Sequence, residues 1–157
     1  MTYEEYRKIR EQEVNELPVF WAFSDDQFRK AMEERGLTEN DTDKIYALGS
    51  GGFYLRTDAD KVRAFFNKPD TLHDLIVNDP VFAEEAFYYE MCNHEYGINY
   101  QGDWDVCSCF CKKELGFKDD KSYVDYLLEA GYNSYVVETY RKARAAYYKA
   151  AEENEWY

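Results

Sequence analysis

The sequence predicts an α+β fold in which a small antiparallel sheet of about three strands packs against a mainly helical body. Three observations support this class. Short runs rich in β-branched and aromatic residues lie only in the first third of the chain, around a glycine-rich tetrapeptide. Longer segments with apolar residues at helical spacing fill the C-terminal half. A length of 157 residues suits one domain, so we expect residues 1 to 157 to fold around one core.

The first segments alternate between helix and strand. Residues 3 to 16 carry apolar side chains at roughly helical spacing among Glu, Arg and Lys, which predicts a surface helix. Residues 19 to 23 form a short apolar and aromatic run that is typical of a buried strand. Ser24 and Gln27 then match a capping box, in which two side chains satisfy free amides at the start of a helix. That helix should end at Gly36.

Two further β-like runs, residues 44 to 48 and 53 to 56, flank the tetrapeptide Gly49-Ser50-Gly51-Gly52. Glycines between two such runs predict the loop of a β-hairpin. A phosphate-binding loop would continue into Lys and then Ser or Thr before a helix, whereas this loop continues into Phe53-Tyr54-Leu55. We therefore expect a plain turn and a three-stranded sheet.

The rest of the chain predicts helices. Their expected ranges are 58 to 66, 70 to 77, 80 to 95 or 96, 102 to 115, 122 to 130 and 133 to 153. Asp79 and Pro80 form a helix-start signal, and Gly97 and Gly116 are the expected stops. The last helix carries an apolar stripe that should face the core; its members are Val136, Tyr140, Ala143, Tyr147 and Ala150.

The composition argues against several classes of function. Acidic side chains number 32 against 19 basic ones, and the resulting net charge of −13 repels nucleic acid and attracts basic surfaces. No run approaches the ~18 apolar residues of a membrane span, and the N-terminus lacks the layout of a secretion signal. We therefore expect a cytoplasmic protein that binds neither nucleic acid directly nor membranes. Its four cysteines should stay reduced as free thiols.

Glu90 and His94 are the most chemically suggestive pair, because they lie one turn apart on the predicted helix and share its apolar face. A buried carboxylate needs a partner, and the imidazole can donate a hydrogen bond to it. Were the protein an enzyme, Glu90 and His94 would be its catalytic residues. No nucleophile accompanies them, so we expect a structural pair in a non-enzymatic protein.

A zinc site is the second chemical possibility, since Cys92, His94 and the thiols of Cys107, Cys109 and Cys111 are zinc ligand types. On helices, Cys92 and His94 would diverge by ~160°, and Cys109 would point away from the face of its two neighbours. A metal would therefore be held by His94, Cys107 and Cys111. No standard zinc spacing is present, so we expect no metal and no cofactor.

Three segments stand out together: Phe20-Trp21-Ala22-Phe23-Ser24 with Gln27-Phe28, then Gly51-Gly52-Phe53, and Tyr89-Glu90-Met91-Cys92-Asn93-His94-Glu95-Tyr96. This combination resembles a family of small acidic proteins carried by phages and mobile elements of Gram-positive bacteria. The resemblance covers roughly residues 18 to 116. It supplies no activity, but it implies an anti-defence role of the anti-CRISPR or anti-restriction kind.

Charge and resemblance together favour a non-enzymatic acidic inhibitor that masks a basic, nucleic-acid-binding surface of a partner protein. The 16 tyrosines offer contact area with a polar tip. The candidate partner-binding residues are Glu84, Glu85, Tyr88, Glu95 and Tyr96. One alternative is a small metal-binding or hydrolytic protein centred on Glu90 and His94. Another is a structural protein that self-associates through its C-terminal helix.

Overall fold

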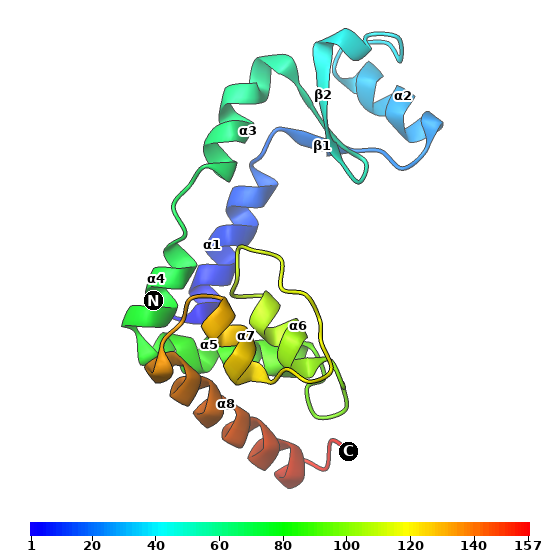
Figure 1. Cartoon of the computed structure of the whole chain (residues 1–157). Helices are drawn as coiled ribbons and strands as arrows, with labels where there is room; N and C mark the ends of the chain where they lie inside the picture. The colour runs from blue at the N-terminus through cyan, green and yellow to red at the C-terminus, as the bar shows by residue number, and fades with distance from the viewer. The chain divides into compact units, whose positions relative to one another are not determined.

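The computed structural model describes residues 1–157 and confirms an α+β fold with a mainly helical body (Figure 1). The chain divides into two compact units. Unit 1 contains Met1–Arg7 and Asp70–Tyr157, and unit 2 contains Lys8–Pro69. The first helix, α1 (Tyr3–Asn15), contributes its start to unit 1 and its remainder to unit 2. The expectation of a single domain remains a prediction.

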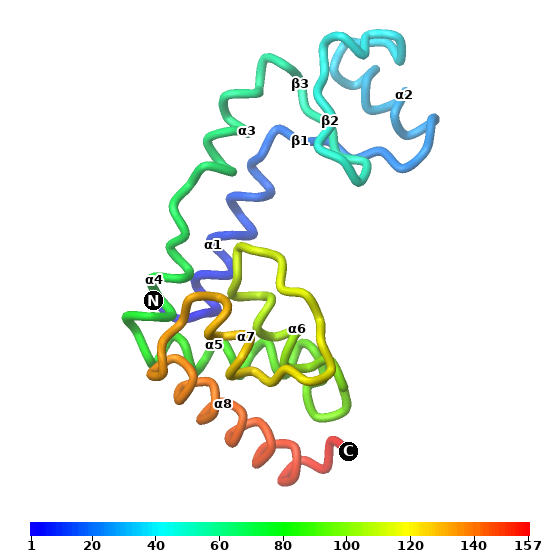
Figure 2. The backbone as a smooth tube through the Cα atoms, in the orientation of Figure 1, coloured from blue at the N-terminus to red at the C-terminus, as the bar shows by residue number.

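Unit 2 contains the whole sheet, and the backbone trace in Figure 2 shows the strands beside helix α2 (Asp25–Glu34). The elements are β1 (Val19–Trp21), α2 (Asp25–Glu34), η1 (Thr42–Lys44), β2 (Ile45–Gly49), β3 (Gly52–Leu55), η2 (Arg56–Asp58) and α3 (Ala59–Phe66). The three strands are antiparallel, as the sequence predicts, and their order in the sheet is β1-β3-β2. Phe20, Met32 and Ile45 form a small core between the sheet and α2.

The start of α2 differs in detail from the predicted capping box. The Ser24 hydroxyl accepts a hydrogen bond from the Gln27 amide at 3.2 Å, as expected. The Gln27 side chain, however, accepts from the amide of Phe23 at 2.8 Å and not from that of Ser24. The helix closes at Gly36, whose φ of 73° lies in the left-handed region that glycine adopts readily.

The glycine-rich tetrapeptide forms the predicted hairpin loop between β2 and β3. Gly49, Ser50 and Gly51 have φ values of 86°, 50° and 85°. Three successive residues in the left-handed region reverse the chain sharply, and the register shifts between Ala47 and Gly49. Strand β3 follows the loop directly, whereas a phosphate-binding loop would lead into a helix.

We expect Gly51→Ala to lower the free energy of unfolding by about 2 to 5 kcal/mol, because left-handed backbone costs about 1 to 2 kcal/mol and overpacking about 1 to 3 kcal/mol. A Cβ on Gly51 would lie 2.8 Å from the Phe23 ring and 2.9 Å from the Ala22 carbonyl oxygen. Gly49→Ala is the matched control, since Gly49 has the same backbone conformation with nothing within 4 Å of the added atom. Urea denaturation of both variants measures the difference; equal losses would show that the contacts with Phe23 and Ala22 do not matter.

Unit 1 is built from helices around one hydrophobic core. They are α4 (Thr71–Asn78), α5 (Pro80–Asn93), α6 (Gly102–Ser108), α7 (Tyr123–Glu129) and α8 (Ser134–Glu153). Helices α5 and α8 share the most extensive contact of the fold. The predicted stripe of α8 faces this core, with all members buried except Ala150, which is half-buried. Any self-association through α8 would therefore have to use its other face.

Two predicted helices are too long. Helix α5 ends at Asn93, because Glu95 adopts a φ of 51° and the Tyr96 amide bonds back to the Met91 carbonyl at 3.1 Å. Gly97 is not the terminating residue. Helix α6 ends at Ser108, and Leu115 lies in the loop beyond it. The Leu115 side chain is buried, and its backbone carbonyl accepts a hydrogen bond from the Trp104 indole. An apolar residue in a packed loop fits the helical pattern as well as a helical residue does. Periodicity alone therefore predicted a longer helix.

Candidate functional site

Glu90 lies in the last turn of α5 and is only 7 % exposed. The Tyr3 hydroxyl donates a 2.7 Å hydrogen bond to its Oε1 atom. The Asn93 side-chain amide donates to its Oε2 atom at 3.1 Å. These donors compensate for the loss of water around the buried carboxylate and fix its orientation.

His94 is the C-cap of α5, and its Nε2 atom lies 3.5 Å from Oε2 of Glu90. The expected pairing is thus present. The ring is nevertheless only partly covered, because the side chain is 31 % exposed. The physical reason is the early end of α5, since the last residue of a helix has no following turn to cover it.

Cys109 completes a cluster of three side chains, which we call the Glu-His-Cys cluster: Glu90, His94 and Cys109. The Cys109 residue is exposed, and its Sγ atom lies 3.4 Å from His94 Nε2 and 3.7 Å from Glu90 Oε2. The sequence favoured Cys107 and Cys111 as companions of His94. That choice assumed a helix through residue 115, whereas Cys109 lies in the turn just after α6.

The other thiols lie elsewhere in unit 1. Cys107 is fully buried in the hydrophobic core, Cys111 packs partly against that core, and Cys92 is exposed. All four cysteines are free, as predicted. Burial raises the pKa of the Cys107 thiol well above its ordinary value.

The cluster does not have the arrangement of a cysteine-nucleophile enzyme. Burial, followed by the neighbouring Glu90 carboxylate, raises the pKa of the Cys109 thiol to about 12. A nucleophilic cysteine needs a lowered pKa and a base oriented by a third group. Here the carboxylate and the sulfur approach the same nitrogen of His94, so Glu90 does not orient the ring from its far side.

The negative charge of the protein is concentrated in unit 1, the unit that contains this cluster. Unit 1 carries 20 acidic and 9 basic side chains, a net −11, whereas unit 2 carries 12 and 10, a net −2. Residues 70 to 111 hold nine Asp or Glu side chains and no Lys or Arg. Such a segment gives unit 1 a field that attracts cations and basic surfaces.

The predicted partner-binding residues are only partly brought together. Glu84, Glu85 and Tyr88 line a shallow groove of about 380 Å³ in unit 1, beside Val81 and Ala146.

The remaining two predicted residues, Glu95 and Tyr96, are not among the residues that line this groove. Glu95 is exposed in the turn after α5. Tyr96 offers little surface to a partner, because it is 7 % exposed and its hydroxyl bonds to Asp103. Its place in the sequence beside Glu95 gave no sign of this burial.

A family model matches residues 2–138, and its description is "Family of unknown function (DUF7659)". The chain belongs to the DUF7659 family. In this family member the matched residues include the Glu-His-Cys cluster, the acidic segment 70 to 111 and the sheet of unit 2. No curated protein and no solved structure matches the chain. No helix of this DUF7659 protein is both long and apolar enough to span a membrane.

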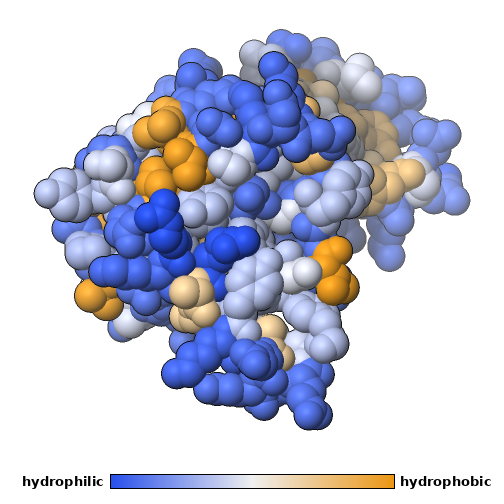
Figure 3. Space-filling view, turned by 60° about the horizontal axis from the view of Figure 1, so that its bottom comes forward, coloured by the Kyte–Doolittle hydropathy of each residue, from blue (hydrophilic) through white to orange (hydrophobic).

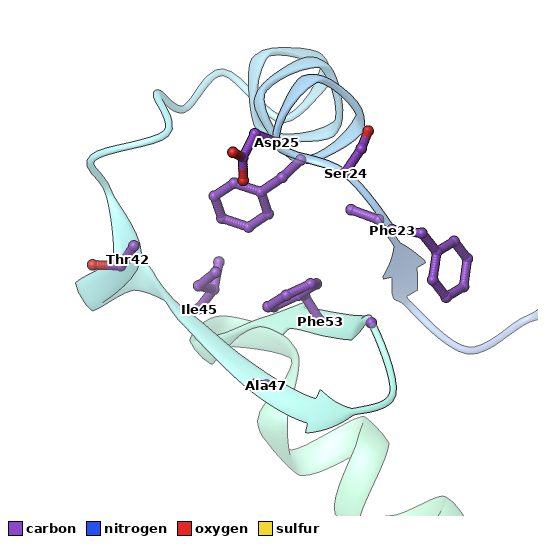
Figure 4. Close-up of a pocket in the computed structure, with 10 residues that line it drawn as sticks. Phe23, Ser24, Asp25, Thr42, Ile45, Ala47 and Phe53 are labelled. Atoms are coloured by element: carbon purple, nitrogen blue, oxygen red, sulfur yellow. The ribbon is translucent and has the colours of Figure 1, made fainter.

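Unit 2 of this DUF7659 protein contains an open pocket of about 660 Å³ that the sequence did not indicate (Figure 4). Ile45 and Phe53 point toward the cavity from the sheet, and Asp25 lies across from them on α2 (Figure 4). The lining is mainly apolar, and Asp25 is its one charged residue. The polar side chains of the lining are the Asp25 carboxylate and the hydroxyls of Ser24 and Thr42, and this set gives the pocket no evident chemistry.

Proposed function

We propose that this protein is a non-enzymatic binding protein whose unit 1 occupies a basic surface of a partner protein. The observation that carries the proposal is the segment 70 to 111, with nine carboxylates and no Lys or Arg. Opposite charge on a partner steers diffusional encounter and raises the association rate, an effect that added salt weakens. A surface of this kind fits best on a protein that normally holds the phosphates of nucleic acid.

The surface of unit 1 supports a polar and electrostatic mode of docking. The face shown in Figure 3 is mostly hydrophilic and carries small, separate hydrophobic patches. Tyr100 and Tyr135 of this unit are more than four-fifths exposed. Exposed tyrosine rings add rigid contact area between the carboxylates and can occupy places where bases would stack.

The resemblance to proteins carried by phages and mobile elements suggests the biological setting. An acidic protein that blocks a nucleic-acid-binding surface would protect such an element from an enzyme that attacks its DNA. We therefore propose an anti-defence inhibitor as the specific form of this binding function.

We expect the combined variant Glu84→Gln, Glu85→Gln and Glu95→Gln to associate with the partner roughly tenfold more slowly at low salt, because steering depends on charge near the docking face. The matched control neutralises three exposed carboxylates of unit 2, Glu33, Glu34 and Glu39, in the same way. The partner is first identified by cross-linking and mass spectrometry in lysate of a Gram-positive host. The association rate of the purified pair is then measured by surface plasmon resonance across a salt series.

Two results support the proposal: a steep fall of the association rate with salt, and displacement of the protein from its partner by duplex DNA. A rate that salt does not change would contradict it. Equal slowing in both variants would also contradict it, because the docking face would then not be that of unit 1.

A further inference from the structure

We infer that Glu90, His94 and Cys109 form a zinc-binding site with three protein ligands and one open coordination position. The inference is independent of the partner-binding proposal, since it rests on the geometry and chemistry of the Glu-His-Cys cluster. Its three potential ligand atoms lie within 4.8 Å of one another and come from two separate segments of unit 1.

The spacing of the three atoms matches one face of a zinc tetrahedron. Zinc binds sulfur at about 2.3 Å and nitrogen or oxygen at about 2.0 to 2.1 Å, so tetrahedral ligand atoms lie about 3.3 to 3.6 Å apart. The observed separations are 3.4 Å for sulfur to nitrogen, 3.7 Å for sulfur to oxygen and 3.5 Å for nitrogen to oxygen. Each agrees with the tetrahedral value to within about 0.2 Å, a shift that a side-chain rotation supplies.

Hydrogen bonding explains the same arrangement less well. A 3.5 Å separation between His94 Nε2 and Glu90 Oε2 is longer than the usual 2.7 to 3.2 Å of an N–H···O bond. In any neutral tautomer, Nε2 either donates to Glu90 or accepts from the Cys109 thiol, so one of these two contacts goes unused. The thiol can instead donate to the Asp105 carbonyl at 3.3 Å, but that bond does not account for the approach of His94 and Glu90 to the sulfur. A cation between the three atoms satisfies all of them together.

Surrounding residues hold the ligands as outer partners do in known metal sites. The Tyr3 hydroxyl bonds to Oε1 of Glu90, which leaves Oε2 facing His94 and Cys109. The side chain of Asn99 donates to the His94 carbonyl at 3.1 Å and to the Asp105 carboxylate at 2.6 Å. Asn99 thereby ties the end of α5, which supplies Glu90 and His94, to α6, whose C-cap is Cys109.

The ligand types select the metal. A thiolate, an imidazole and a carboxylate suit zinc, whereas calcium and magnesium prefer oxygen ligands alone. The acidic segment 70 to 111 adds a field that favours a divalent cation over an anion. Three protein ligands leave a fourth position for water, as in zinc sites that are not purely structural.

The test is metal binding by the full chain purified without added metal and exposed to one equivalent of ZnCl₂, followed by gel filtration and elemental analysis. We expect one zinc per chain. With CoCl₂ in place of zinc, we expect intense visible bands of a tetrahedral ion and a near-ultraviolet band from the cobalt–thiolate bond. Cys109→Ser should remove that near-ultraviolet band and weaken zinc binding at least 100-fold. Tyr3→Phe should weaken it 10- to 100-fold, the usual effect of losing an outer partner.

Cys92→Ser and Cys111→Ser are the matched controls, because they remove a thiol elsewhere in the same unit. Both should bind zinc like the unmodified protein. Circular dichroism establishes that each variant is folded, and the exposed position of Cys109 makes its variant safer than one at the buried Glu90. Absence of zinc after gel filtration would overturn the inference, as would binding that survives Cys109→Ser but is lost in Cys92→Ser or Cys111→Ser.

Discussion

Phe87→Ala should lower the free energy of unfolding by about 3 to 5 kcal/mol, the usual cost of removing a fully buried phenyl ring. Phe87 has no exposed surface, and its ring meets those of Phe110 and Tyr140 edge-on at centroid distances of 4.9 and 5.1 Å. These contacts join α5 to α8 and to the turn after α6. The substitution leaves a cavity at the centre of unit 1 that rigid neighbouring rings cannot fill.

Urea denaturation followed by circular dichroism measures this loss as a shift of the midpoint at unchanged slope. Val81→Ala is the control on the same helix, since Val81 is 76 % exposed and its truncation should change stability by less than about 0.5 kcal/mol. A loss below about 1 kcal/mol for Phe87→Ala would show that the core of unit 1 is not packed as described.

Asp103→Ala should be the second most damaging change, with a loss of roughly 3 kcal/mol, because each buried donor left without an acceptor costs about 1 to 3 kcal/mol. The Asp103 carboxylate accepts hydrogen bonds from the Tyr96 hydroxyl, from the Tyr140 hydroxyl at 3.1 Å and from the Tyr123 amide at 3.2 Å. Burial raises the pKa of both phenols, and Asp103 adds to the effect, so both remain protonated donors. One carboxylate thus links α6, α7, α8 and the turn after α5.

The same denaturation experiment applies to this network. Asp119→Ala removes an exposed carboxylate of unit 1 outside the network and should be nearly neutral. Asp103→Asn keeps one acceptor oxygen, so its stability should lie between those of the Asp103→Ala and Asp119→Ala proteins. Similar stability of the Asp103→Ala and Asp119→Ala proteins would mean that water replaces the carboxylate without cost.

Local signals in the sequence predicted most of the fold. The glycines around Ser50 indicated the hairpin, and Asp79 with Pro80 marked the start of α5. Helix ends were less predictable. Glu95 occupies the left-handed position that glycine usually takes, and the apolar Leu115 belongs to a packed loop. Both depend on contacts with distant residues, which periodicity does not contain.

The candidate site was predicted in part. Helical geometry brought Glu90 and His94 onto one face, because four residues make about one turn. The choice among the three nearby thiols depended on where α6 ends. Because the helix was predicted to end at residue 115 and not at Ser108, Cys107 and Cys111 were chosen in place of Cys109. Tyr96 was taken for a surface residue because its neighbours are polar, whereas Asp103 and the α8 tyrosines bury it.

The sequence alone determined the types of the elements and the one-turn spacing of Glu90 and His94. It also determined that residues 70 to 111 carry acidic side chains but no Lys or Arg. These properties depend on composition or on backbone geometry over a few residues. Only the tertiary structure decided that Cys109 meets this pair and that Tyr96 is buried. Glu90 and Cys109 are 19 residues apart, and their approach depends on the turn after α5, the length of α6 and the packing of both helices.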